Sequence, residues 1–279
     1  RSTLLASSAA SDVYKRQHFA PLQGYTDWIY RNIFIRFFKG IDAYYTPFIR
    51  VEKGNVFRNR DLRDIDPANN EVVGLIPQIL PGSTEEFGLL AALLRAKGYS
   101  RADINLGCPF PLIAGQKKGA GMLPYPDLVR TIMESVATFP DIRFSVKMRL
   151  GWSDKQECLN LLPILNECPL THITLHARTG KQQYKGETDP EMFGYFYREC
   201  RHPLFYNGDL DSVHQIQMIL QRFPELKGVM LGRGLLSNPA LAENVKYHCS
   251  EATDSVSRKR DFMLSLIHIS EPTRRTPIS

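Results

Sequence analysis

The chain has 279 residues and a mass of 31.8 kDa, which suits one α/β barrel and is long for a single sandwich or bundle. Hydrophobic residues make up 43% and charged residues 23%, so a large core can form and global disorder is excluded, and no apolar run approaches the roughly 20 residues of a membrane span. The formal net charge of +6 indicates an acidic partner only mildly.

The two ends of the chain resemble sequencing adapters. Residues 12–17 (DVYKRQ) can be encoded by GAT GTG TAT AAG AGA CAG, and the reverse complement of that string encodes residues 264–269 (LSLIHI). Two ends of a natural gene have no reason to encode each other's opposite strand. We therefore expect residues 1–17 and 264–279 to be non-native and leave them out of fold prediction. They carry five basic and two acidic residues, so the remaining 18–263 has a net charge of only +3.

Strand-like and helix-like segments alternate along residues 18–263. Short apolar or β-branched runs predict eight strands, at 18–22, 43–47, 72–79, 101–106, 144–149, 172–176, 204–207 and 228–231. Helical patterns are predicted at 26–38, 84–96, 126–139, 155–166, 190–201, 212–222 and 239–248. The polar stretches 50–70 and 109–125 are predicted as long loops.

This alternation predicts parallel strands joined by right-handed crossovers. Eight such units fill one closed barrel, so we expect an α/β fold, a single-domain (β/α)8 TIM barrel over 18–250, with 251–263 as the start of a truncated C-terminal region. An open doubly wound sheet is the competing architecture, but no G-x-G-x-x-G follows the first strand.

Polar residues follow nearly every predicted strand, where barrel enzymes keep their chemistry. Lys147 lies in an otherwise apolar strand, where a cation is costly unless an anion meets it, either in a core ion pair or as part of an anionic cofactor such as a reduced flavin. The turns around Gly208 and around Arg233 suit phosphate binding, although ordinary turn glycines are the alternative.

Three further residues at strand ends are candidates. Cys108 follows the fourth strand and is either a buried apolar residue or a catalytic one. The five cysteines of the chain are scattered without a C-x-x-C pair, which argues against a zinc site or a disulfide framework and for a reducing cytoplasm. His176 ends the sixth strand and is either structural or functional, whereas His172 is expected to be incidental. The amide of Gln78 suits the edge of a heterocycle.

Basic residues fall in loops on the same predicted face, and aromatic residues lie nearby. Such a mixture suits nucleic acid, although acidic neighbours dilute it and a charged loop is often only solvated. The basic residues are Arg50, Lys53, Arg58, Arg60, Arg63, Lys117, Lys118, Lys181 and Lys185, and the aromatic ones are Tyr25, Tyr44, Tyr45 and Tyr184.

With these motifs assembled, the chain resembles the tRNA-dihydrouridine synthase family. The matching strings are APLQGYTD (20–27), DINLGCP (103–109), GAGML (119–123), VKMRLG (146–151), HART (176–179), NGD (207–209) and MLGRG (230–234), in family order. The resemblance implies a cytoplasmic FMN-containing barrel that reduces a tRNA uridine with NADPH, without metal or membrane, and we expect a monomer.

The resemblance also implies site residues. It places the proton donor on Cys108 and substrate contacts on Asn105, Arg149 and Arg178. It places FMN contacts on Pro21, Leu22, Gln23, Gln78, Lys147, His176, Asn207, Gly208, Asp209, Gly232 and Arg233.

The chain departs from the family pattern at three points. Leu22 stands where Met is common, and Pro-Phe-Pro follows Gly107-Cys108 where relatives often have Pro-Ser-Lys, so a tRNA contact there is expected to be lost or moved. A helical C-terminal domain that helps to hold tRNA is expected to be missing. Two alternatives stay open: another FMN barrel reductase of a free pyrimidine or enoate, and a non-catalytic RNA-binding barrel.

Overall fold

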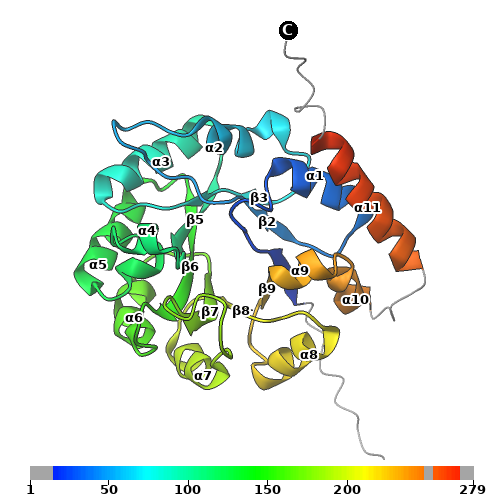
Figure 1. Ribbon diagram of the computed structural model, residues 1–279. Coiled ribbons are helices and arrows are strands. Elements are labelled where there is room, and N and C mark those ends of the chain that lie inside the picture. Colours follow the sequence, from blue (N-terminus) through cyan, green and yellow to red (C-terminus); the bar gives the residue numbers. More distant parts are fainter. Residues whose placement is uncertain (1–14, 248–253, 271–279) are drawn as a thin grey trace, which may run out of the picture.

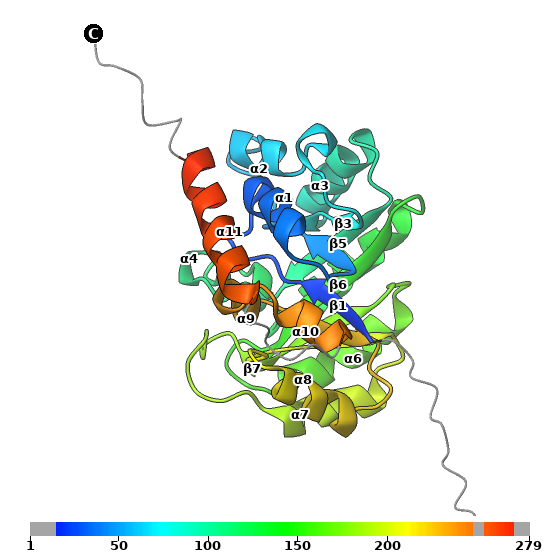
Figure 2. The ribbon, with the colours of Figure 1, turned by 90° about the vertical axis from the view of Figure 1, so that its right-hand side faces the viewer.

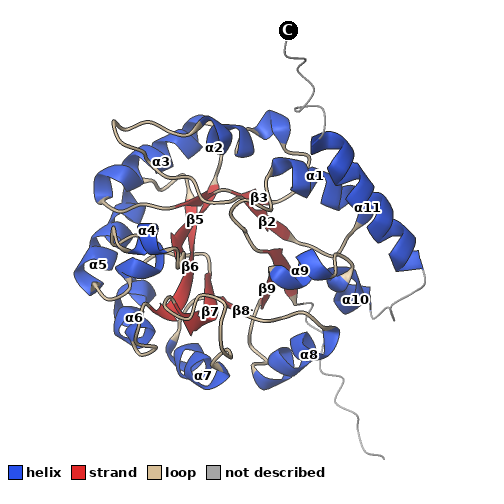
Figure 3. Ribbon diagram, viewed as in Figure 1, coloured by secondary structure: helices blue, strands red, loops and turns tan. Residues whose placement is uncertain are grey.

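A ring of parallel strands lies at the centre of the molecule, with the helices around it (Figure 1; Figure 3). The computed structural model describes residues 15–247 and 254–270. The strands are β1 (Arg16–Phe19), β2 (Ala43–Tyr45), β3 (Leu75–Ile76), β4 (Gln78–Ile79), β5 (Arg101–Leu106), β6 (Arg143–Gly151), β7 (Ile173–Thr179), β8 (Leu204–Asn207) and β9 (Gly228–Leu231).

The ring closes through one bent segment. The strand order is β3-β2-β1-β9-β8-β7-β6-β5-β4, and every pairing is parallel. β3 and β4 are consecutive pieces on either side of Pro77, which has no backbone N–H for the ladder. β3 pairs with β2 and β4 with β5, so the predicted third strand occupies one position of an eight-position barrel. The predicted TIM barrel is confirmed, and the open sheet is wrong.

Helices are found at all seven predicted places, whereas those at Arg233–Ser237 and Asp254–Ser270 were not predicted. The helices are α1 (Trp28–Phe37), α2 (Asn59–Asp64), α3 (Thr84–Ala96), α4 (Pro111–Ala114), α5 (Pro126–Ser135), α6 (Glu157–Glu167), α7 (Pro190–Glu199), α8 (Val213–Arg222), α9 (Arg233–Ser237), α10 (Leu241–Tyr247) and α11 (Asp254–Ser270). Ser83 caps α3, and Ser212 with Gln215 forms a capping box on α8. The two predicted loops contain the short helices α2 and α4.

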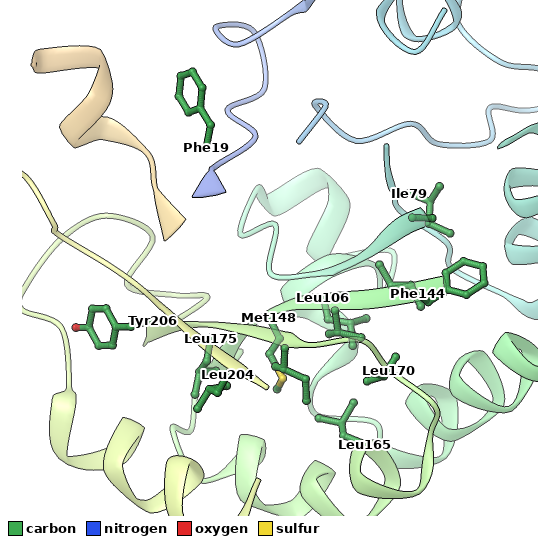
Figure 4. Packing of buried hydrophobic residues seen from close by; sticks show 14 of the residues in the cluster. Phe19, Ile79, Leu106, Phe144, Met148, Leu165, Leu170, Leu175, Leu204 and Tyr206 are labelled. Atoms are coloured by element: carbon green, nitrogen blue, oxygen red, sulfur yellow. The ribbon is translucent and has the colours of Figure 1, made fainter. Parts of the chain in front are cut away.

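Alternation along each strand divides the side chains between two layers. Residues such as Leu106, Met148 and Leu175 face the helices and pack with Leu165 in one continuous core (Figure 4). Burying each such side chain stabilises the fold by roughly 1.5–3 kcal/mol. The opposite faces fill the barrel interior and supply the polar groups at its carboxyl-terminal mouth.

The amino-terminal half of the barrel interior is plugged by aromatic rings. The Tyr45 hydroxyl lies 3.1 Å from His18 Nδ1 and 2.8 Å from His172 Nε2. Phe205 stacks on His18 with ring centroids 4.0 Å apart. His172 is therefore part of the packed interior.

The helix α11 runs along the outside of the barrel beside α1 (Figure 2). Its Phe262 is 2% exposed and packs against rings from α1 and the residue that follows it, namely Tyr30, Phe34, Phe37 and Phe38. None of the described helices is long and apolar enough to cross a membrane.

Parts of the adapter-like ends fall within these elements. Residues 16 and 17 belong to β1, and residues 264–270 belong to α11. Their non-native origin and the proposed boundaries stay predictions. Residues 1–14, 248–253 and 271–279, which include Cys249 and the end of the helix predicted at 239–248, lie outside the described residues.

Candidate active site

A cavity of about 480 Å³ opens at the carboxyl-terminal ends of the strands, within the size range of small-molecule sites. All eight barrel positions contribute strand-end residues to it. All fifteen residues singled out from the sequence line it: Pro21, Leu22, Gln23, Gln78, Asn105, Cys108, Lys147, Arg149, His176, Arg178, Asn207, Gly208, Asp209, Gly232 and Arg233. The structure brings them together; their individual roles stay predictions.

Two glycines keep one side of the cavity clear. Gly208 has φ +131°, and a Cβ there would lie 2.9 Å from Cγ2 of Thr188 and 3.3 Å from Cδ2 of His176. A Cβ on Gly232 would lie 3.4 Å from Cβ of Ala20. Both turns line the cavity without a side chain of their own, which suits the close approach of a phosphate group.

An ion-pair cluster lies beside these glycines. Asp209 accepts hydrogen bonds from the guanidinium groups of Arg178 and Arg233, the latter at 2.6 Å, and the hydrogen bond and charge of Arg178 lower the pKa of its carboxyl. The Arg178 side chain is 1% exposed, whereas that of Arg233 is 48% exposed. Arg233 is therefore held at the cavity by a partner that an incoming anion can replace.

Lys147 extends from β6 as an uncompensated cation. It forms no ion pair with any residue in the described part of the chain, so the core ion pair considered above is not found there. Burial, and next the charge of Arg149, lower the pKa of Lys147 to about 8, while the charge of Asp103 opposes this shift without reversing it. An anion in the cavity would stabilise this ammonium group.

His176 presents a buried nitrogen that lacks a partner. Its Nε2 makes no hydrogen bond within the described residues, although the ring is only 5% exposed. Burial, and then the charges of Arg149 and Lys147, hold the pKa of His176 well below its ordinary value, so the imidazole is neutral. An unsatisfied buried polar atom is unfavourable unless a ligand bonds it.

The Cys108 thiol lies at the end of β5, half-buried. It packs against the apolar cluster of Phe48, Leu80 and Ile113. Burial raises the pKa of the Cys108 thiol above its ordinary value, although nearby cations oppose the shift. The group is therefore a protonated thiol at neutral pH, which suits an acid better than a nucleophile.

Arg149 is engaged by the protein itself. Its guanidinium donates to the carbonyl oxygens of Gly107, Thr179 and Gln183 at 2.7–2.9 Å. Burial lowers its pKa to about 10, so it stays charged. Arg149 thus ties the turn after β5 to the loop after β7.

Tyr184, named from the sequence only as an aromatic residue suited to nucleic acid, lies under two guanidinium groups, 4.6 Å from Arg233 and 5.4 Å from Arg149. Sequence reasoning missed two further residues of this region. Phe48 lines the cavity directly after the second predicted strand. Asp103 of β5 is completely buried, and the sequence signal that could have singled it out is an acidic residue within an otherwise apolar strand.

Several loop cations are neutralised by neighbours. Arg50 pairs with Glu52 and Lys118 with Glu86 at 2.8 and 2.7 Å. Arg58 pairs with Asp61 at 2.8 Å. The predicted basic surface is thereby reduced. Within residues 15–247 and 254–270, no group of three histidines, cysteines or acidic residues is placed to hold a metal ion.

The family profile described as dihydrouridine synthase (Dus) matches residues 18–271. The chain belongs to the dihydrouridine synthase family. Its relatives include tRNA-dihydrouridine synthase B of Pasteurella multocida (strain Pm70), 26% identical over 228 residues that cover 81% of this chain and 67% of that protein. The tRNA-dihydrouridine(16) synthase of Aquipseudomonas alcaligenes is 31% identical over 243 residues, covering 81% and 73%. The resemblance drawn from the sequence motifs is confirmed, and with it the expectation of an oxidoreductase.

Solved structures share the fold. Morphinone reductase in complex with tetrahydroNAD has a TM-score of 0.60 at 12% identity, covering 84% of this chain and 87% of that one. The old yellow enzyme from Trypanosoma cruzi has a TM-score of 0.60 at 10% identity, with coverages of 84% and 89%. At these identities the likeness supports the barrel fold and no more.

Proposed function

We propose that this protein reduces a uridine of tRNA to 5,6-dihydrouridine, with FMN bound in the cavity and NADPH as the reductant. Family membership and the gathering of all fifteen predicted residues around one cavity support the proposal. The single observation that carries it is the unpaired cation of Lys147 facing a cavity beside the unpartnered Nε2 of His176.

The residues present fit FMN. A flavin phosphate would be held by Arg233 beside the open backbone at Gly208 and Gly232, replacing Asp209 as the partner of Arg233. The buried Nε2 of His176 and the ammonium of Lys147 are left for the polar edge of the ring system. When bound, FMN supplies hydride transfer.

Lys147 and His176 prepare the cavity electrostatically. The ammonium of Lys147 stabilises negative charge on whatever ring lies against β6, and it is already in place before the reaction. Because His176 is neutral, its ring nitrogen offers a hydrogen bond without adding another cation to a cavity that already contains Arg149 and Arg178.

Cys108 is proposed to donate the proton that completes reduction of the uracil ring. Its raised pKa keeps the proton on sulfur at neutral pH, and its place at the end of β5 directs it to the cavity. A uridine inside folded RNA must leave its stack to reach these groups, at a cost of a few kcal/mol. We propose Asn105, Arg149 and Arg178 as its contacts, and that the protein acts as a cytoplasmic monomer.

The test is dihydrouridine formation by the FMN-loaded protein with NADPH and tRNA that lacks the modification. Nucleoside mass spectrometry should show dihydrouridine, and Cys108→Ala, prepared with the same flavin content, should slow its formation at least about a hundredfold. Reduction of a free pyrimidine or an enoate in place of tRNA would establish the alternative reductase. Binding of tRNA by a protein that takes up no flavin would establish the RNA-binding alternative.

A further inference from the structure

A chain of buried hydrogen bonds connects Asp103 with the turn that carries Cys108. The carboxylate of Asp103 accepts from Nε2 of Gln78 at 2.7 Å and from the hydroxyl of Ser145 at 2.6 Å. Oε1 of Gln78 then accepts from Nδ2 of Asn105 at 2.7 Å. All four side chains are at most 7% exposed.

The chain ends on the backbone. Oδ1 of Asn105 accepts from the backbone N–H groups of Gly107 and Cys108 at 2.9 and 2.8 Å. These bonds hold the turn by which the chain leaves β5. The turn also meets the Arg149 guanidinium through the Gly107 carbonyl, so its backbone is fixed from both sides.

The direction of every bond in this chain is determined by its two ends. A carboxylate only accepts hydrogen bonds, and a backbone N–H only donates. Gln78 must therefore turn its NH2 group toward Asp103 and its oxygen toward Asn105. Asn105 must turn its NH2 group toward Gln78 and its oxygen toward the backbone N–H groups of the turn. If one amide were inverted, two NH2 groups or two oxygens would face each other in a buried place.

We propose that Asp103 is a positioning residue: its acceptor oxygen fixes the orientation of Gln78 and Asn105 and thereby holds the backbone of the turn that presents the Cys108 thiol to the cavity. Its meaning for catalysis rests on the function proposed above, whereas the hydrogen-bond chain itself needs neither flavin nor RNA.

Three variants separate this role from packing and from charge. Asp103→Leu removes the acceptor, which frees Gln78 and Asn105 to invert, and it also inserts a larger apolar side chain at a fully buried position, an effect that the double variant shares. Asp103→Asn removes the charge, yet its amide oxygen can still accept the hydrogen bond of Gln78 while its NH2 group donates to the Ser145 hydroxyl. The backbone N–H groups at the other end of the chain still fix the orientation of Asn105 and Gln78, so they favour this arrangement. Asp103→Leu combined with Gln78→Glu places a carboxylate, which only accepts, next to Asn105.

The readout is the alkylation rate of Cys108 by iodoacetamide in the flavin-free protein, followed by mass spectrometry of its peptide. We expect Asp103→Leu to react about tenfold faster, the factor that corresponds to losing hydrogen bonds that hold a buried turn. Asp103→Asn and the double variant should stay within about twofold of the parent. Cys200, half-buried at the end of α7, is the internal control and should not change in any variant.

Each other outcome overturns the proposal. A parental rate in Asp103→Leu means that the turn does not depend on the chain. An Asp103→Asn rate that matches Asp103→Leu assigns the effect to charge, and a double variant that stays fast assigns it to packing. If Asp103→Leu fails to fold, Gln78→Met cuts the same chain one bond later and must itself accelerate alkylation of Cys108. Since the assay uses no flavin, tRNA or NADPH, its failure and that of the proposed function are distinguishable.

Discussion

Replacing Lys147 by methionine should stabilise the flavin-free protein while weakening its function. Burial lowers the pKa of this amine from 10.5 to about 8, which at roughly 1.4 kcal/mol per pH unit corresponds to about 3 kcal/mol of destabilisation near neutral pH. Methionine keeps the length of the unbranched stem without the charge. Part of this stabilisation is offset because Asp103 loses the attraction of a nearby cation. We therefore expect the free energy of unfolding of Lys147→Met to exceed that of the parent by about 1–3 kcal/mol.

The pH dependence of this gain has a defined sign. Below about pH 8 the amine is protonated in both the folded and the unfolded chain, and the full burial cost is present. Between about 8 and 10.5 the folded protein releases the proton while the unfolded chain keeps it, so the parent gains stability relative to the variant. The advantage of Lys147→Met should therefore be constant below pH 8 and shrink as the pH rises toward 10.5.

The assay is urea unfolding of parent and variant in parallel near pH 7 and near pH 9.5. Lys181→Met, an exposed lysine on the loop after β7, is the matched control and should change stability by no more than about 0.5 kcal/mol at either pH. A Lys147→Met protein that is less stable than the parent near pH 7, or whose gain does not fall with pH, would refute the claim that this cation is uncompensated.

Three other substitutions test separate parts of the structure. Arg233→Ala removes a half-exposed ion pair and the cation–π contact with Tyr184, so the free energy of unfolding should change by no more than about 1 kcal/mol. FMN affinity, measured by flavin fluorescence, should fall at least about tenfold, and an equal loss of riboflavin affinity would contradict a phosphate role. Gly208→Ala forces a Cβ to 2.9 Å from Thr188 at a positive φ, so it should destabilise the protein by about 1–3 kcal/mol in urea unfolding and reduce FMN uptake. A variant that matches the parent in stability and in FMN uptake would contradict the need for glycine at this position. Phe262→Ala removes the central ring of the cluster between α11 and α1 and should lower the free energy of unfolding by about 3 kcal/mol. Its control is Met263→Ala, which changes an exposed neighbour and should lower it by less than about 0.5 kcal/mol. Similar values for the two variants would mean that α11 does not stabilise the barrel.

Local signals in the sequence predicted most of the architecture. The helix α3 has the predicted bounds because a serine cap, an acidic first turn and an apolar face all coincide there. The strand predicted at 72–79 is divided because Pro77 cannot donate to a ladder and Gly74 has φ +80°. The short helix α2 was predicted as loop because tertiary contacts support it: Asp64 at its end pairs with the fully buried Arg31 of α1.

The location of the cavity was predictable because strand ends meet at one mouth in any parallel barrel. The partners of each polar residue were not. Asp209 was expected at a phosphate, and the structure shows it bridging two guanidinium groups, one from each neighbouring strand end. Gln78 was expected at a heterocycle, and its amide is engaged on both sides by residues of β5. Such pairings depend on register and rotamer, which spacing in the sequence does not encode.

Uptake of FMN by the purified chain shows whether the polar cavity is a flavin site. We expect the protein titrated with FMN to acquire a flavin visible spectrum at one equivalent per chain. Lys147→Ala and Arg233→Ala should bind FMN more weakly, and denaturation should release unaltered FMN. A folded protein that takes up no flavin, or one whose uptake is indifferent to both substitutions, would contradict the proposed flavin site.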